Sequence, residues 1–208
     1  AVSCGFQPQA GTSFAPVYAN SDGSTTETEQ YASIQSGVTS TNLAYLNVKS
    51  GTYSESVVVD KELIINGENG AVMDGSNLDA QAVGVRIESS DVTFNNIDVT
   101  NFKGNGIICG YEASTPGNLQ NVNITNCAIS NIQPGYSHGF GIYVGYESQG
   151  FGNGKLTQHL DYSGLVIENN EITNTYSSAL VLQSITSSSN PLKVINNYIH
   201  DNTTNSGI

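Results

Sequence analysis

Positively charged side chains are scarce in this sequence. Six lysines and arginines stand against 18 aspartates and glutamates, which gives a formal net charge of −12 over 208 residues. A surface with this balance repels the phosphate backbone of nucleic acids. We therefore expect no nucleic-acid partner. The same balance favours solubility and attracts cations.

Long hydrophobic runs are missing as well, and charges of either sign are few. Charged residues make up 12 % of the chain, about half of the usual share. Uncharged polar groups must therefore cover the surface, and the chain supplies 24 asparagines and 22 glycines. Because no stretch of about 20 apolar residues occurs, we expect no membrane span. The composition favours a secreted or cell-surface protein, and Ala1 would suit a start left by signal cleavage.

Cysteines are too few and too scattered to build a disulfide scaffold. The three are Cys4, Cys109 and Cys127. One disulfide with a free thiol and three buried thiols both fit an odd number. Neither arrangement matches the spacing of a metal site. We expect these cysteines to bind no metal or other cofactor. Binding of Ca²⁺ by other side chains remains an open alternative.

An internal repeat decides the expected fold. Four ten-residue segments, at 92–101, 122–131, 165–174 and 192–201, align without gaps. Apolar residues occupy their first, third and eighth positions, Asn the fifth, and Asn or Asp the tenth. Their starts lie 30, 43 and 27 residues apart, and a small residue and an apolar run follow each segment. Self-similarity of this kind indicates units that stack on their neighbours.

The repeat predicts strands that turn sharply at asparagine. Apolar residues at alternate positions mark a strand with one buried face. Asn tolerates the left-handed backbone that a sharp turn needs, and stacked Asn side chains can form a hydrogen-bonded ladder. The expected ladder is the fifth position: Asn96, Asn126, Asn169 and Asn196. We therefore expect an all-β fold, a right-handed parallel β-helix or solenoid, because Val, Ile and Thr disfavour helical repeats.

The whole chain reads as one domain. Residues 1–30 are expected to form an N-terminal arm or cap, and residues 31–208 to form the coils. Tyr31, Ile34 and Val38 fall at helical spacing and predict a short helix that caps the first coil. The widest repeat spacing predicts one long loop insertion at 133–164, on what is often the binding face of a solenoid.

The stretch from residue 31 to residue 67 resembles the opening of pectin-lyase-like β-helix proteins. This superfamily includes pectinesterases and carbohydrate-binding surface repeats. The resemblance rests on ASIQSGV at 32–38, VKSGTYSESV at 48–57 and INGE at 65–68. It implies the β-helix fold and a carbohydrate as one class of ligand. Weaker similarity of the same kind covers the rest of the chain.

The catalytic motifs that the resemblance implies are incomplete. Residues 81–86 resemble the pectinesterase segment that supplies an oxyanion-side glutamine. The family's following Gln-Asp-Thr run is replaced by Asn-Phe-Lys-Gly-Asn at 101–105, and its second catalytic Asp is absent. A polysaccharide lyase would need a Lys or Arg base, for which Lys103 and Lys155 are candidates, and usually Ca²⁺. No cluster of Asp in the repeats suggests a calcium cage.

The 133–164 segment holds the remaining candidates for chemistry. A histidine beside a carboxylate could act in acid–base catalysis, and aromatic rings beside carboxylates suit sugar binding. The weak catalytic candidates are His138, Glu147, Lys155 and Asp161, and the ligand-binding candidates are Tyr136, Tyr146, Phe151 and Tyr162. Phe140 and Tyr143 flank a predicted strand, so we expect them to pack against the solenoid instead.

Two functions follow from the sequence. The first is a non-enzymatic β-helix module with a structural, adhesive or self-assembling role. Gly207 and Ile208 match the first residues of a next strand, so the chain is either a piece of a longer protein or a subunit that stacks end to end, up to a filament. The second function is a carbohydrate-active protein, a lyase, hydrolase, esterase or glycan binder, that uses the 133–164 segment. The sequence favours the first function by a narrow margin.

Overall fold

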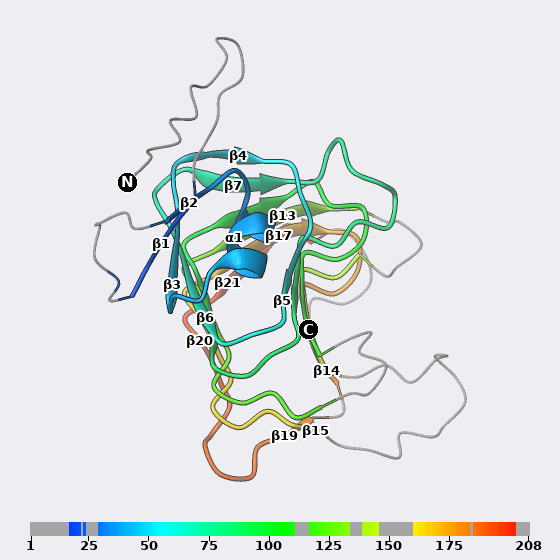
Figure 1. The fold of residues 1–208 in the computed structure, drawn as a ribbon. Coiled ribbons are helices and arrows are strands. Elements are labelled where there is room, and N and C mark those ends of the chain that lie inside the picture. Colours follow the sequence, from blue (N-terminus) through cyan, green and yellow to red (C-terminus); the bar gives the residue numbers. More distant parts are fainter. Residues whose placement is uncertain are drawn as a thin grey trace, which may run out of the picture.

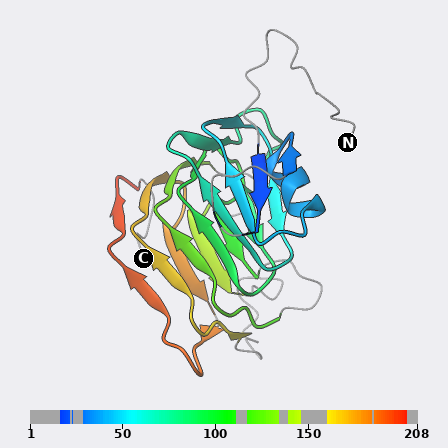
Figure 2. The same cartoon turned by 60° about the vertical axis from the view of Figure 1, so that its left-hand side comes forward.

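The computed structural model of this protein describes residues 17–21, 23, 29–110, 117–133, 139–145, 160–183 and 185–202. These residues are mostly β, with one short helix, α1 (Ile34–Ser40). Their strands form sheets of eight, six, five and two strands. In Figure 1 the three larger sheets surround a common interior, and Figure 2 shows their strands lying side by side along the stack.

The strands are short, and each sheet gathers segments that are far apart in the sequence. The eight-stranded sheet holds, in spatial order, β2 (Glu29–Tyr31), β1 (Val17–Asn20), β3 (Tyr45–Val48), β6 (Leu63–Gly67), β9 (Val92–Asn95), β12 (Asn123–Thr125), β16 (Val166–Glu168) and β20 (Lys193–Ile195). The six-stranded sheet holds β21 (Tyr198–His200), β17 (Glu171–Thr175), β13 (Ala128–Ile132), β10 (Asp98–Thr100), β7 (Ala71–Asp74) and β4 (Gly51–Tyr53). The five-stranded sheet holds β18 (Leu180–Gln183), β14 (Ile142–Gly145), β11 (Ile107–Cys109), β8 (Val85–Ile87) and β5 (Val57–Val59). β15 (Leu160–Asp161) and β19 (Ile185–Thr186) pair separately.

Successive strands enter the three larger sheets in a fixed rotation. β9, β10 and β11 enter the eight-, six- and five-stranded sheets in turn, and β12, β13 and β14 repeat the order one layer further on. β16, β17 and β18 repeat it again. Apart from β1, which pairs antiparallel with both β2 and β3, all these pairings are parallel. One turn of the chain therefore adds one strand to each sheet.

Parallel register places identical repeat positions on top of one another in the interior. The third repeat position supplies Phe94, Ile124 and Ile167, which pair in register and are 0 % exposed. The eighth position supplies Val99, Ile129 and Ile172, which are equally buried. A fully buried aliphatic or aromatic side chain contributes about 1.5–3 kcal/mol. These columns therefore hold the layers together.

The fifth repeat position turns the chain as the sequence predicts. Asn96, Asn126, Asn169 and Asn196 have φ of 55°, 56°, 57° and 56°. The predicted ladder differs in detail, because within the described part of the chain no hydrogen bond joins two of these four residues. The Asn126 amide donates instead to Asn95 Oδ1 at 2.7 Å, and the Asn96 amide donates to the Gly67 carbonyl at 2.7 Å. Asn126 and Asn96 are thus hydrogen-bonded to Asn95 and Gly67 of the preceding layer.

Two further columns also take positive φ. The tenth position does so at Asn101, Asn131, Asn174 and Asp201, as expected for a second turn, and Asn174 donates directly to Asn131 Oδ1 at 2.6 Å. The sequence analysis missed a third column, Asp91, Asn121 and Gly164, with φ of 58°, 55° and 75°. Each of these residues directly precedes the first position of a repeat segment. Asn121 donates to Asp91 Oδ1 at 2.8 Å.

A buried asparagine also forms hydrogen bonds inside the coil. Asn170 follows the turn column and is 1 % exposed. Its amide donates to the Ile124 carbonyl at 2.9 Å, and its side-chain oxygen accepts from the Cys127 amide at 3.0 Å. The Asn197 side-chain oxygen accepts from both the backbone and the side chain of Asn170, each at 3.0 Å. These bonds satisfy backbone groups that the bend leaves unpaired.

The N-terminal region closes one end of the stack. Ile34 and Val38 of α1 are 0 % exposed and cover the first coil, which confirms the predicted capping helix, while Tyr31 ends β2 instead. The Ser33 hydroxyl caps α1 in a capping box with Ser36. Within the predicted N-terminal arm or cap at 1–30, the described strand β1 extends the eight-stranded sheet and buries apolar side chains.

Gln35 closes the edge of the five-stranded sheet at this end. Its side-chain oxygen accepts from the Val58 amide at 2.7 Å, and its side-chain amide donates to the Val58 carbonyl at 3.4 Å. The Glu55 carboxylate accepts from the first amides of α1, those of Ile34 and Gln35, at 2.8 and 2.9 Å. The helix is therefore bonded to the coil that it covers.

We expect Asn126→Ala to lower the free energy of unfolding by about 1–2 kcal/mol, because alanine is strained at positive φ. Asn126→Gly is the matched control, since it loses the same bond to Asn95 without that strain. Urea denaturation followed by circular dichroism measures both variants. If the two variants are equally stable, the left-handed turn does not explain the asparagine.

We expect Asn170→Ala to lower the free energy of unfolding by about 1–3 kcal/mol, because it leaves the buried Cys127 amide without a partner. The control is Asn190→Ala, which removes an exposed side chain. Equal stability of the two variants in urea titrations would contradict a stabilising role for the buried Asn170 side chain.

Candidate functional site

A strand divides the segment that was expected to be one loop at 133–164. β14 lies between β11 and β18 in the five-stranded sheet. Ile142 and Val144 point into the core with 0 % exposure, in register with Ile107 and Cys109. The single-loop prediction is therefore wrong, because the apolar run after the repeat segment takes the next strand position of the coil.

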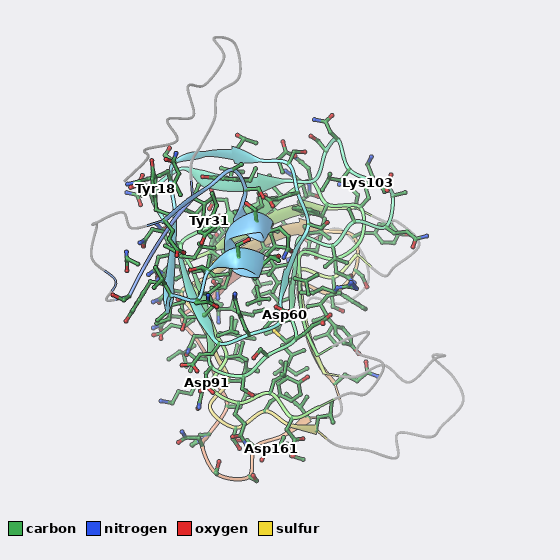
Figure 3. All side chains as sticks on the ribbon, in the orientation of Figure 1. Tyr18, Tyr31, Asp60, Asp91, Lys103 and Asp161 are labelled. Carbon is green, nitrogen blue, oxygen red and sulfur yellow. The ribbon has the colours of Figure 1, made fainter. Side chains whose placement is uncertain are left out.

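Six of the eight predicted site residues lie outside the described residues, and their roles stay predictions. They are Tyr136, His138, Tyr146, Glu147, Phe151 and Lys155. The structure describes the other two, Asp161 and Tyr162, at the end of β15. Figure 3 shows Asp161 at the corner of the stack, near the bottom of the view.

Asp161 is an acceptor for serine groups. Its carboxylate accepts from the Ser163 hydroxyl at 2.5 Å, from the Ser163 amide at 3.0 Å and from the Ser188 amide at 3.2 Å, as well as from the Ser188 hydroxyl. The bond from the Ser163 hydroxyl, followed by that from Ser188, lowers the pKa of Asp161 to about 2. A carboxyl held as the anion is a poor proton donor at neutral pH. The Asp161 carboxylate therefore connects the chain at Ser163 with the chain at Ser188.

Tyr162 belongs to the core, which corrects its predicted role as a ligand-binding ring. Its side chain is 0 % exposed, and its hydroxyl donates to the Cys109 carbonyl at 3.2 Å. Burial raises the pKa of this hydroxyl. A ring enclosed in this way has no face left for a sugar. The alternation that marks strands could not reveal this burial, because Tyr162 lies beyond the repeat segments.

Phe140 and Tyr143 pack against the coil as expected. They form a cluster with Ile108 on the five-stranded sheet, separate from the main core. The rings of Phe140 and Tyr143 stack with centroids 5.4 Å apart. The Tyr143 hydroxyl donates to Gln183 Oε1 at 2.8 Å. These contacts use the rings for packing between adjacent layers.

The two described cysteines are free and buried. Cys109 and Cys127 form no disulfide. Burial raises the pKa of each thiol to about 12. Such thiols are protonated and unreactive at neutral pH. Cys4 lies outside the described residues, so its pairing is not tested.

The feature that stands out for function is the end of the stack farthest from α1. β18, β20 and β21 are each the last strand of one of the three larger sheets. We call these three strands the open coil. Figure 2 shows β20 and β21 along the outer margin of the stack, in orange to red. Three sheet edges thus lie at one end of the molecule.

The open coil exposes side chains that the repeat directs inward. Leu182 is 40 % exposed, whereas its register partner Val144 is 0 % exposed. Val194 is 37 % exposed, whereas its partner Ile167 is 0 % exposed. The inward pattern continues in these strands, and among the described residues no further strand pairs with them. An apolar surface bordered by sheet edges is a site for association.

His200 joins the open coil to the layer beneath it. Its Nδ1 lies 2.8 Å from Asp201 Oδ2, and its Nε2 lies 2.9 Å from Glu171 Oε1. The hydrogen bond to Asp201, followed by that to Glu171, raises the pKa of His200. The ring stacks on Tyr198 with centroids 4.1 Å apart. Both ring nitrogens are engaged, so His200 serves attachment of the layer.

No cofactor site emerges from the described part of the chain. There, no three His, Cys, Asp or Glu side chains gather so that they could hold a metal ion. The described residues therefore suggest no ligands for Ca²⁺.

No helix among the described residues has the length and apolar character needed to cross a membrane.

Comparison of the chain with protein-family models, with curated proteins and with solved structures finds no match. Its function must therefore be argued from its own residues.

The Asp161 network predicts a titration at low pH. The folded pKa is depressed from 3.8 to about 2, so the serine bonds are complete above pH 3.8 and are lost as the pH falls through about 2. The backbone amide shifts of Ser163 and Ser188, measured by NMR, should titrate with this midpoint. Asp161→Asn should abolish the titration. A midpoint at 3.8 or above would contradict the network.

Proposed function

We propose that this chain is a secreted or cell-surface right-handed parallel β-helix with a structural role, in which its open coil packs against a second copy of the chain. The observation that carries the proposal is the exposure of Leu182 and Val194 at positions that every earlier layer buries. The proposal uses one end of the stack and requires no catalytic group.

Three observations support the β-helix assignment. Each turn of the chain adds one parallel strand to each of three sheets. Columns of asparagine at positive φ form the bends between them. Parallel strands connected in this way are almost always joined with a right-handed sense. The resemblance of residues 31–67 to pectin-lyase-like proteins points to the same architecture.

Self-association at the open coil follows from the physics of sheet edges. An edge strand presents unpaired backbone groups, which readily pair with another strand. In the open coil, the edges border the apolar side chains of Leu182 and Val194. Pairing with a second layer would satisfy the edges and bury these side chains together.

The capped end favours a closed pair over a fibre. A head-to-tail fibre needs both ends of the stack to accept a neighbour. At the far end, α1 covers the interior and Gln35 bonds both backbone groups of Val58. A two-fold axis joins the open coil to its own copy and leaves the capped ends outside. Such an axis makes the paired edge strands antiparallel.

A carbohydrate-active site in the 133–164 segment has less support. The Asp161 carboxylate accepts hydrogen bonds from serine groups. The Tyr162 ring lies in the core, where its hydroxyl donates to the Cys109 carbonyl. The other candidates of that segment lie outside the described residues. Acid–base chemistry by His138 or Glu147 therefore stays a prediction from sequence.

Light scattering coupled to size-exclusion chromatography tests the assembly. We expect the wild-type chain to elute as a dimer. Val194→Lys should convert it to a monomer, because a charge on an edge strand opposes pairing. The folded state should survive this change, since Val194 is already 37 % exposed.

Thr39→Lys is the matched control, because it adds the same charge to an exposed position of α1 at the opposite end. It should leave the dimer intact. A wild-type monomer would overturn the proposal. Fibres that Thr39→Lys dissolves would show head-to-tail stacking and would overturn the two-fold pair.

A further inference from the structure

A second feature, remote from the open coil, is a groove of about 450 Å³. It crosses the beginnings of β3, β6, β9 and β12 in the eight-stranded sheet. Its lining residues are Asn42, Leu43, Ala44, Glu62, Leu63, Ile64, Asp91, Thr93, Asn121 and Asn123. This volume lies within the usual range of ligand sites. Four successive layers build it, so its shape is fixed by the register of the coil.

The groove presents hydrogen-bonding groups of both kinds. Glu62 and Asp91 supply carboxylate oxygens, and Asn42, Asn121 and Thr93 supply donors as well as acceptors. Among the described residues, neither Asn42 nor Glu62 makes a side-chain hydrogen bond. Bonds within the lining hold the other groups in place.

Those internal bonds fix the far side of the groove. Asn121 donates to Asp91 Oδ1 at 2.8 Å, and Asn123 donates to Thr93 Oγ1 at 3.3 Å. Asp91 and Asn121 also belong to the third turn column, which sets their backbone at positive φ. The polar groups are therefore positioned before any ligand arrives, which reduces the entropy lost on binding.

The charges of the groove restrict its ligand. Glu62 and Asp91 repel acidic groups, so the groove disfavours a uronate or phosphate. A simple cation cannot accept a hydrogen bond from the side-chain amide of Asn42, and no three His, Cys, Asp or Glu side chains of the described residues gather here to hold a metal ion. The neighbouring Lys61 holds its ammonium against the Thr41 carbonyl at 2.5 Å, which adds a positive charge beside the groove. Figure 3 shows Lys103 on the opposite side of the molecule from Asp91.

We infer that this groove binds a neutral oligosaccharide. Sugar hydroxyls both donate and accept, so they can pair with the carboxylates and with the amides at once. Leu43 and Ile64, which are half-buried in the lining, offer apolar contact to the C–H faces of a sugar. The parallel layers repeat polar groups along the groove, which suits a ligand made of repeated units.

This site is independent of the proposed assembly. Its lining comes from the layers of β3, β6, β9 and β12, whereas the open coil is β18, β20 and β21. Val194→Lys should therefore change the oligomeric state without changing sugar binding. Loss of one property with retention of the other separates the two proposals.

Isothermal titration calorimetry with the full chain tests the site. The probes are cellohexaose, mannohexaose and maltohexaose, with hexagalacturonate as the acidic comparison. We expect at least one neutral hexaose to bind with a Kd of about 1 mM or tighter and the acidic one not to bind. Glu62→Gln and Asp91→Asn, which remove charge and keep shape, should each weaken binding about tenfold or more.

Asp60→Asn is the control, because it neutralises an exposed carboxylate outside the lining. It should leave the Kd unchanged, and circular dichroism should show all three variants folded. The inference is overturned if no neutral hexaose binds at millimolar concentration. It is equally overturned if hexagalacturonate binds as well as they do, or if both groove variants bind like the wild type.

Discussion

A positive φ recurs at the bends of the repeat segments, at three bends in each of the turns that begin at Asp91, Asn121 and Gly164, and the stacking of these layers depends on it. Without these bends the strands could not pass from one sheet to the next within a few residues. Asparagine and aspartate occupy all ten of the non-glycine positions with this conformation in the described part of the chain. Their short side chains stabilise the left-handed backbone locally. Eight of the 24 asparagines thus have a backbone cause.

The interior beside these bends changes character along the stack. The sixth repeat position is Ile97 and Cys127 in the earlier layers but Asn170 and Asn197 in the later ones. Apolar side chains there add to the core, whereas the asparagines bond the backbone of the bend. At this position, the earlier layers are therefore held by packing and the later ones by hydrogen bonds.

The sequence predicted the part of the fold that repeats. Alternation of apolar residues located the strands at 92–201, and the asparagines located two of the three bends. The third bend was missed because Asp91, Asn121 and Gly164 share only a tolerance of positive φ. The burial of Tyr162 was not predicted, because it depends on packing against Gly110 and Cys109, which come from a different layer. The groove was invisible for the same reason, since its residues come from four separate layers.

Among the described residues, each strand of the three larger sheets pairs only with strands of the adjoining layers, so this part of the molecule behaves as a one-dimensional array. In such an array, stability is approximately the sum of terms for single layers and for neighbouring pairs. Among the described strands, β18, β20 and β21 each have one neighbour in their sheet instead of two. For the described residues, we therefore expect fraying to begin at these strands and to proceed one layer at a time toward α1. The helix end acts as the anchor from which the coil can rebuild, which gives unfolding and refolding a direction along the stack.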